Sequence, residues 1–274
     1  MTAPAASTSR PTFSWLRVRT VVRRHNYVLW RSPERWFDII IFPLFDVLLW
    51  GSLGAFVAQE NDVSRASTPY LLAGIMVFHI LFQSQIAVST GFMEETWSRN
   101  LLNMMTTPLR EIEYVVGLAA YGFIKLAAAM TMVSVTAFAL YRFGLGEVGW
   151  GLVPIAGLLV VIGWSMAMMV VGMLLRFGQS AQILAWATTF LILAISGVFN
   201  PVEAIPGVLQ PIARNLPTTH VFTAARALLD GRPMPWGELG QGAIGAVVFA
   251  ALAVAFVTHM LATFRKRGYV TRYS

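Results

Sequence analysis

Ionisable side chains interrupt three long apolar stretches of this sequence. Asp46 follows "FDIIIFPLF", His79 follows "LLAGIMVF", and Lys125 lies within "GFIKLAAAM". A charge is costly in apolar surroundings, so each of these side chains needs either a partner or a function. We predict that Asp46 and Lys125 form a charge pair with His79 nearby, and we favour a structural role for the pair over contact with a substrate.

Hydroxyl and amide side chains in the same stretches can form hydrogen bonds. His79, Gln83 and Thr90 fall near one helical face, while Gln85 and Ser89 form a second pair four residues apart. A later apolar run adds Thr188, Thr189 and Ser196. Such groups either line a path for a transported molecule or hold helices together, and the pattern leaves both interpretations open.

The residue types that carry most enzyme chemistry are sparse. The chain has no cysteine, and its histidines are scattered, at His25, His79, His220 and His259. Neither lysine, Lys125 nor Lys266, follows a glycine, so no phosphate-binding GK[ST] loop is present. The sequence also lacks HExxH and GxSxG motifs and any cluster with metal-ligand spacing. We therefore expect no enzyme activity, no metal and no cofactor in this chain.

Composition indicates that membrane helices position these groups. The 274 residues are 57% hydrophobic and 12% charged, with a mean hydropathy of +0.65. A soluble domain carries about 25% charged residues. Much of the net charge of +7 lies in the two terminal segments beside apolar runs, which favours a membrane surface over nucleic acid. The start lacks the apolar run of a secretory signal, so we expect insertion through the spans themselves.

We predict an all-α integral membrane protein with six transmembrane helices. A helix needs about 20 mostly apolar residues to cross the hydrocarbon core. Six stretches meet this condition: 37–57, 70–92, 114–141, 150–175, 181–199 and 242–264. The chain then forms one transmembrane domain, with a cytoplasmic tail (1–36), a six-span bundle (37–264) and a basic cytoplasmic tail (265–274).

Arginine and lysine placement orients these spans. With both termini inside, fourteen basic residues lie on the cytoplasmic side and five lie outside. The positive-inside rule therefore places both termini in the cytoplasm, at a bacterial plasma membrane. On this topology Asp46 lies roughly 14 Å deep, and His79 and Lys125 lie roughly 17–20 Å deep, close enough for a lysine side chain to bridge the difference.

Two segments have the pattern of amphipathic helices at the cytoplasmic surface. In residues 15–30 aromatic and aliphatic residues interleave with arginines, which favours an interfacial helix along the inner leaflet over an ordinary basic tail. The second segment lies in the connection 93–113, "MEETWSRNLLNMMTTPLREIE", where Pro108 ends the helix. Periodicity alone gives nearly equal support to two roles for this second helix: docking to another protein or resting on the membrane.

The order of these features resembles the type 2 permeases of ATP-binding-cassette (ABC) transporters. In that family the same connection carries a glutamate, a basic residue, leucines and a Thr-Pro-Leu pattern, as in "EETWSRNLLNMMTTPL" here. The chain departs from the family at Asn100-Leu101, where Gly-Thr is frequent. The resemblance implies a coupling helix that docks to an ATP-binding subunit and consists of Glu94, Glu95, Trp97, Arg99, Leu101, Leu102 and Met105.

A second stretch carries the same resemblance. Before the last span the chain reads "FNPVEAIPGVLQPIARNLPTTH", with an arginine following, and family members are similar there. We expect Pro206 in the first turn of a short helix, which Pro211 weakens, and Pro217 at the start of another. We predict two short re-entrant or interfacial helices that form an extracytoplasmic exit lid with Pro201, Pro206, Pro211, Pro217, His220 and Arg226.

The resemblance implies the membrane subunit of an ATP-driven exporter. Two permease copies, as a homodimer or a related heterodimer, would form the pore, and two ATP-binding subunits would hold ATP and Mg²⁺. In the family, spans one, two and five face the dimer axis, so the translocation path candidates are His79, Gln83, Thr90, Thr188, Thr189 and Ser196. Family members export drugs, glycans and lipids. An ATP-independent transporter or channel and an intramembrane enzyme of lipid metabolism remain as alternatives.

Overall fold

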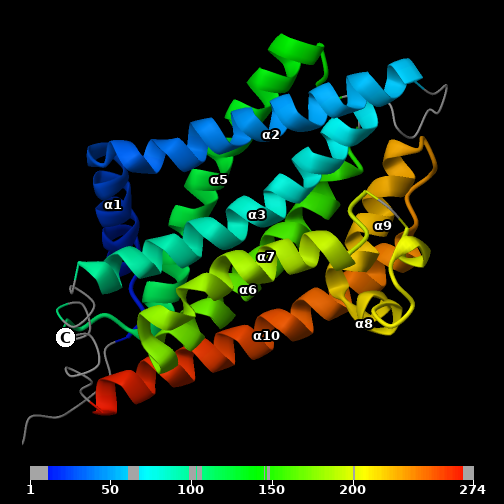
Figure 1. Cartoon of the computed structure of the whole chain (residues 1–274). Helices are drawn as coiled ribbons and strands as arrows, with labels where there is room; N and C mark the ends of the chain where they lie inside the picture. Colours follow the sequence, from blue (N-terminus) through cyan, green and yellow to red (C-terminus); the bar gives the residue numbers. More distant parts are fainter. Residues whose placement is uncertain are drawn as a thin grey trace, which may run out of the picture.

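Helices are the only regular elements in the part of the chain that the computed structural model describes, namely residues 12–60, 68–98, 103, 107–144, 146, 149–199 and 201–267 (Figure 1). Five of them are long and apolar enough to cross a membrane: α2 (Pro33–Glu60), α3 (Thr68–Trp97), α5 (Glu111–Tyr141), α6 (Leu152–Phe177) and α10 (Trp236–Arg267). These helices contain five of the six predicted spans. The shorter elements are α1 (Trp15–Arg31), η3 (Gly178–Gln182), α7 (Ile183–Ile195), η4 (Val202–Ala204), α8 (Gln210–Asn215) and α9 (Pro217–Leu229).

Helix α3 is the central element of the bundle. It packs against α2, α5, α6 and α7, and its residues 72–89 are buried without interruption. Gly163 lets α6 approach α3 closely, because an added Cβ would lie 2.8 Å from the backbone oxygen of Leu81. Small residues at such contacts are typical of membrane helix pairs. The polar side chains of α3 therefore face other helices of the same chain.

The prediction of six full-length spans is not confirmed. The fifth expected span, 181–199, contains α7, which has 13 residues. That corresponds to about 20 Å of helix, against a hydrocarbon core of about 30 Å. The 3-10 helix η3 precedes α7, and Gly197 follows it with a φ of +64°, a value suited to a glycine that ends a helix. The apolar run extends past the helix, so hydropathy overstated the helix length.

The proline-marked segment folds as two short helices, but one proline has a different place from the prediction. Helix α8 has Pro211, not Pro206, in its first turn. Pro206 stands before it, in a turn where Leu209 N–H donates to the Pro206 oxygen at 2.8 Å. Pro217 occupies the first turn of α9 as expected. Proline suits these positions because a first-turn N–H has no helical acceptor.

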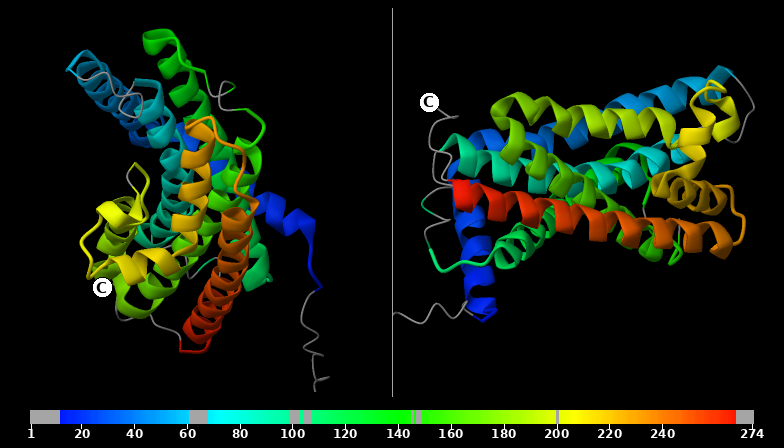
Figure 2. Two further views of the ribbon diagram at one scale, coloured as in Figure 1. Left: turned by 90° about the vertical axis from the view of Figure 1, so that its right-hand side faces the viewer. Right: turned by 90° about the horizontal axis from the view of Figure 1, so that it is seen from below.

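The long helices run side by side and define two ends of the bundle, which Figures 1 and 2 show from three sides. At one end α1 lies across the last turn of α3 and the start of α5; we call this the basic end. At the opposite end lie α8 and α9, next to the start of α10; we call this the pocket end. Helix α9 packs against α6 and α10, so it belongs to the bundle.

Candidate functional site

At the basic end, arginines of α1 are paired with glutamates of two long helices. Glu113 in the first turn of α5 is fully buried, with 0% of its side chain exposed. It accepts hydrogen bonds from Arg17 Nε at 2.7 Å, from Arg17 Nη2 at 2.6 Å, and from the backbone N–H groups of Ser14 and Arg110 at 2.7 and 3.0 Å. The hydrogen bond to this carboxylate raises the pKa of Arg17. A single carboxylate thus fixes the start of α1 on α5.

Two further pairs join α3 to α1 and to α2. Arg24 donates from Nε and Nη2 to the two oxygens of Glu95, both at 2.8 Å. Arg35 in α2 lies 3.0 Å from Glu94. Forked arginine–carboxylate pairs restrict orientation as well as distance. Helix α1 is therefore held in one register against the bundle.

A buried histidine lies inside this attachment. His25 Nδ1 is 3.0 Å from the Val21 oxygen and Nε2 is 3.3 Å from the Gly91 oxygen. Its ring centroid lies 5.1 Å from that of Tyr121. Burial lowers the pKa of His25, although Glu95 at 3.6 Å acts in the opposite direction. Burial thus favours the neutral imidazole.

The residues predicted to dock to an ATP-binding subunit are only partly described. Glu94, Glu95 and Trp97 lie in the last turn of α3. Glu95 faces Arg24 of α1, Glu94 faces Arg35 of α2, and Trp97 is exposed. The other four lie outside the described residues: Arg99, Leu101, Leu102 and Met105. The docking role stays a prediction, but the structure joins this connection directly to α1.

The predicted intramembrane pair has a different partner. Asp46 Oδ2 lies 3.4 Å from His79 Nδ1, so among the described residues it is His79, and not Lys125, that lies beside Asp46. Lys125 is buried in α5. Counting depth along a helix compares heights alone, whereas the direction of each side chain decides which partner it meets. Aromatic rings of α2, α3 and α7 continue from His79 with centroids 5.6–6.2 Å apart: Phe82, Trp186 and Phe42.

The residues predicted to line a translocation path form hydrogen bonds within the chain. Thr189 Oγ1 donates to Gln85 Oε1 at 2.6 Å, which joins α7 to α3. The Ser196 and Thr218 hydroxyls lie 2.6 Å apart and join the end of α7 to α9. The remaining candidates have partners on their own helices: His79 with Gln83, Thr90 with Ile86, and Thr188 with Leu184. A lining role for these residues stays a prediction.

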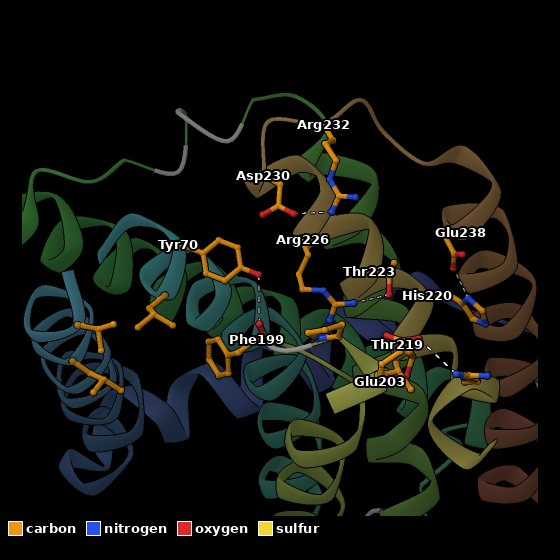
Figure 3. A pocket seen from close by; sticks show the side chains of 16 residues that line it. Tyr70, Phe199, Glu203, Thr219, His220, Thr223, Arg226, Asp230, Arg232 and Glu238 are labelled. Carbon is orange, nitrogen blue, oxygen red and sulfur yellow. Dashed lines mark hydrogen bonds and ion pairs between the residues drawn. The ribbon is translucent and has the colours of Figure 1, made fainter. Parts of the chain in front are cut away.

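A cavity of about 810 Å³ lies at the pocket end, between the end of α2, the start of α3 and α9 (Figure 3). This volume is in the range of about 300–1,000 Å³ that small-molecule sites occupy. Its apolar lining includes Leu53, Val57, Leu71, Phe199 and Val202. Its polar lining consists of Tyr70, Glu203, Arg214, Thr219, His220, Thr223, Arg226, Asp230, Arg232 and Glu238. The structure thus brings Pro201, His220 and Arg226 of the predicted exit segment together.

Arg226 is the buried cation of this cavity. Only 9% of the residue is exposed, and its Nη2 donates to Thr223 Oγ1 at 2.9 Å. Burial lowers the pKa of Arg226 by more than Tyr70, Glu203 and Asp230 raise it. Three pairs of titratable side chains also lie at the cavity: His220 with Glu238 at 2.7 Å, Arg232 with Asp230 at 2.6 Å, and Arg214 with Glu203 at 3.6 Å.

Several residues of these sites had no place in the sequence-based predictions, among them Glu113, Tyr70 and Thr219. Glu113 could have been found, because an acidic residue that opens a span can face the arginines of a preceding amphipathic helix. Tyr70 gave the ordinary signal of an aromatic residue at a span end. Thr219 gave no signal, because a hydroxyl in a short helix is common. The cavity becomes visible only when α3 and α9 are placed side by side.

Comparison with known proteins found one family model that covers residues at both ends of the bundle. The family model of the ABC-2 type transporter matches residues 17–229, which run from α1 to the end of α9. The chain belongs to the ABC-2 type transporter family. Nodulation protein J of Rhizobium leguminosarum bv. trifolii is 28% identical over 227 residues, which cover 78% of this chain and 81% of that protein.

Membership in the ABC-2 type transporter family fixes the general role of the chain. It is a membrane subunit of an ABC transporter, and chains of this family work with ATP-binding subunits in bacterial membranes. The resemblance to permeases that the sequence suggested is confirmed. The matched residues contain the pairs Arg17–Glu113 and Arg24–Glu95, which attach α1 to the bundle. They also contain most of the cavity lining, but not α10.

Proposed function

We propose that this ABC-2 chain is the permease subunit of an ATP-driven exporter. The observation that carries the proposal is the family match across both ends of a bundle with five span-length apolar helices. Two copies, identical or related, would enclose the path, and two ATP-binding subunits would bind ATP and Mg²⁺. The substrate would be a hydrophobic or amphipathic molecule leaving the cell, such as a drug, a lipid or a glycan.

The basic end would face the cytoplasm and the pocket end the outside. The excess of arginine and lysine on the side of both termini supports this orientation. A sixth crossing keeps both termini on that side. Helices η3 and α7 together measure about 30 Å and run beside α6 from the basic end to the pocket end (Figure 1). Helices α8 and α9 would be the re-entrant or interfacial lid at the exit.

The ion pairs of α1 offer a route for coupling. An ATP-binding subunit docked at the connection 93–113 would move the end of α3 as its nucleotide state changes. Glu95 would carry this displacement to α1 through Arg24, and Glu94 would carry it to α2 through Arg35. Packed elements tend to move as rigid bodies between two arrangements. The α1 attachment would therefore make several helices respond together.

The second copy would pack on the exposed faces of α2 and α7. Large apolar side chains on these helices are exposed, among them Phe45, Leu49 and Phe190. Because the chain has no cysteine, single substitutions give clean cross-linking. We expect Leu49→Cys to cross-link two copies and Val247→Cys, which is more exposed but lies on α10, not to. The reverse result would place the second copy on α10.

Co-purification and vesicle transport test the exporter assignment. The full-length chain should co-purify with an ATP-binding subunit, and transport by the complex should stop when the Walker A lysine of that subunit is replaced. Transport that persists without ATP would favour the ATP-independent transporter. Absence of transport together with turnover of a membrane lipid would favour the enzyme.

A further inference from the structure

We propose that the pocket-end cavity binds an amphipathic anion, with its carboxylate, phosphate or sulfate group at Arg226 and Thr219. The apolar part of the ligand would lie against Leu53, Val57 and Phe199. The inference rests on the proposed function in one respect: the ligand reaches this end either as the exported substrate or as the headgroup of a lipid around the exit. Binding itself requires no ATP-binding subunit.

The first argument is the position of the cation. Arg226 reaches from α9 to the middle of the residues that line the cavity (Figure 3). The groups that act on it electrostatically include the carboxylates of Glu203 and Asp230, yet the cost of burial outweighs them. An anion brought to a buried cation gains a strong interaction, since water is scarce there. Arginine also matches the planar oxygens of a carboxylate or phosphate with two parallel hydrogen bonds.

The second argument is an unused hydroxyl. Thr219 is 4% exposed, lines the same cavity, and its Oγ1 has no hydrogen-bond partner in the described part of the structure. A buried hydroxyl without a partner costs about 1–3 kcal/mol, so such groups are expected to meet a ligand or water. A threonine hydroxyl can donate to an anion oxygen. Thr219 and Arg226 therefore offer donors to the same guest.

The third argument is the state of the carboxylates. Glu203, Asp230 and Glu238 would attract a cationic ligand if they were free, but Glu203 and Asp230 form ion pairs with Arg214 and Arg232, and Glu238 Oε2 lies 2.7 Å from His220 Nδ1. The side chains of Glu203 and Glu238 are 70% and 41% exposed, so their charges are also screened by solvent. The polar lining thus favours an anion near Arg226 over a cation.

The fourth argument is the apolar part of the lining. Leu53 and Val57 of α2 and Leu71 of α3 come from helices long and apolar enough to cross a membrane. Phe199 also lines the cavity, and its ring stacks on Trp50 at a centroid distance of 4.4 Å. A site with one apolar side and one cationic side selects molecules that have both characters. Free inorganic anions would gain the polar contacts but not the apolar ones.

The test uses the full-length chain in nanodiscs of neutral lipid and a fluorescent fatty acid, 11-(dansylamino)undecanoic acid, with its methyl ester as the uncharged control. We expect the acid to bind at least ten times more tightly than the ester. Arg226→Gln should weaken binding of the acid at least tenfold, Arg226→Lys less, and Thr219→Val about threefold. Arg176→Gln removes an exposed arginine that does not line the cavity and should change the affinity less than twofold.

Equal binding of acid and ester would overturn the proposal, as would wild-type affinity in folded Arg226→Gln. If Arg226→Gln does not fold, Arg226→Lys and Thr219→Val decide, and unchanged affinity in both overturns it. Competition by phosphatidylglycerol in the nanodisc would identify a lipid headgroup as the source of the anion, whereas displacement by soluble amphiphiles alone would identify substrate. Failure of the chain to associate with an ATP-binding subunit would contradict the proposed function while leaving this assay unaffected.

Discussion

The buried charged groups have opposite signs at the two ends of the bundle. At the basic end the buried groups are the carboxylates of Glu95 and Glu113, and each holds an arginine of α1 by two hydrogen bonds. At the pocket end the buried group is the guanidinium of Arg226, which donates to Thr223 Oγ1 and lines the cavity. The first arrangement fastens one helix to others. The second places a buried cation at a cavity, where we propose that an anion binds.

The largest loss of stability is expected from Glu113→Ala at the basic end. The substitution removes the acceptor for Arg17 and for two backbone N–H groups, so α1 should detach. We expect the melting temperature in detergent to fall by about 5–10 °C. Protease should also cleave α1 faster. Glu111→Ala, in the same turn, is the control, and an unchanged melting temperature in Glu113→Ala would contradict the fastening role.

A smaller loss is expected from Thr218→Val at the pocket end. This change breaks a buried hydrogen bond between neutral hydroxyls and leaves Ser196 without that partner. We expect the free energy of unfolding to fall by about 1 kcal/mol. Thr131→Val is the matched control, because that hydroxyl is exposed and bonds only within α5. A loss as large as that of Glu113→Ala would erase the contrast between the ends.

Acidification should weaken the basic end through His25. Burial lowers its pKa, so below the ordinary histidine pKa of about 6.5 the unfolded chain binds a proton that the folded chain resists. The His25 contribution to stability is therefore present above pH 6.5 and is lost as the pH falls below it. Protease cleavage of α1 should rise roughly threefold between pH 7.5 and 5.5. If His25→Asn shows the same rise, another group is responsible.

The smallest effect on stability is expected from Arg226→Gln. Because burial of this cation is costly, its removal should change the free energy of unfolding by about 0.5 kcal/mol or less, while binding of the anionic probe falls at least tenfold. Thermal unfolding with and without probe measures both quantities. A loss of about 2 kcal/mol without probe would instead make Arg226 a structural brace.

Several features of the fold could be predicted because they depend on local pattern. The predicted span 150–175 corresponds to α6, Leu152–Phe177, and the predicted span 114–141 corresponds to α5, Glu111–Tyr141. Long, mostly apolar runs must be helical in a membrane. The interfacial helix at 15–30 became Trp15–Arg31 for a similar reason. The length predicted for the helix in the run 181–199 was too great, because the helix ends before Gly197, which has a positive φ. Pro211 rather than Pro206 lies in the first turn of α8. The sequence rule did not distinguish them, because either proline suits the first turn of a helix.

The sequence by itself determined the class of protein, the helical segments and the excess of basic residues near the termini. These properties follow from hydropathy and charge, which need no knowledge of partners in space. The tertiary structure alone decided that Asp46 meets His79, that Glu113 holds α1, and that Thr219 and Arg226 share a cavity. Such pairings depend on how each helix is rotated about its axis and which neighbour it faces, and sequence distance carries no record of either.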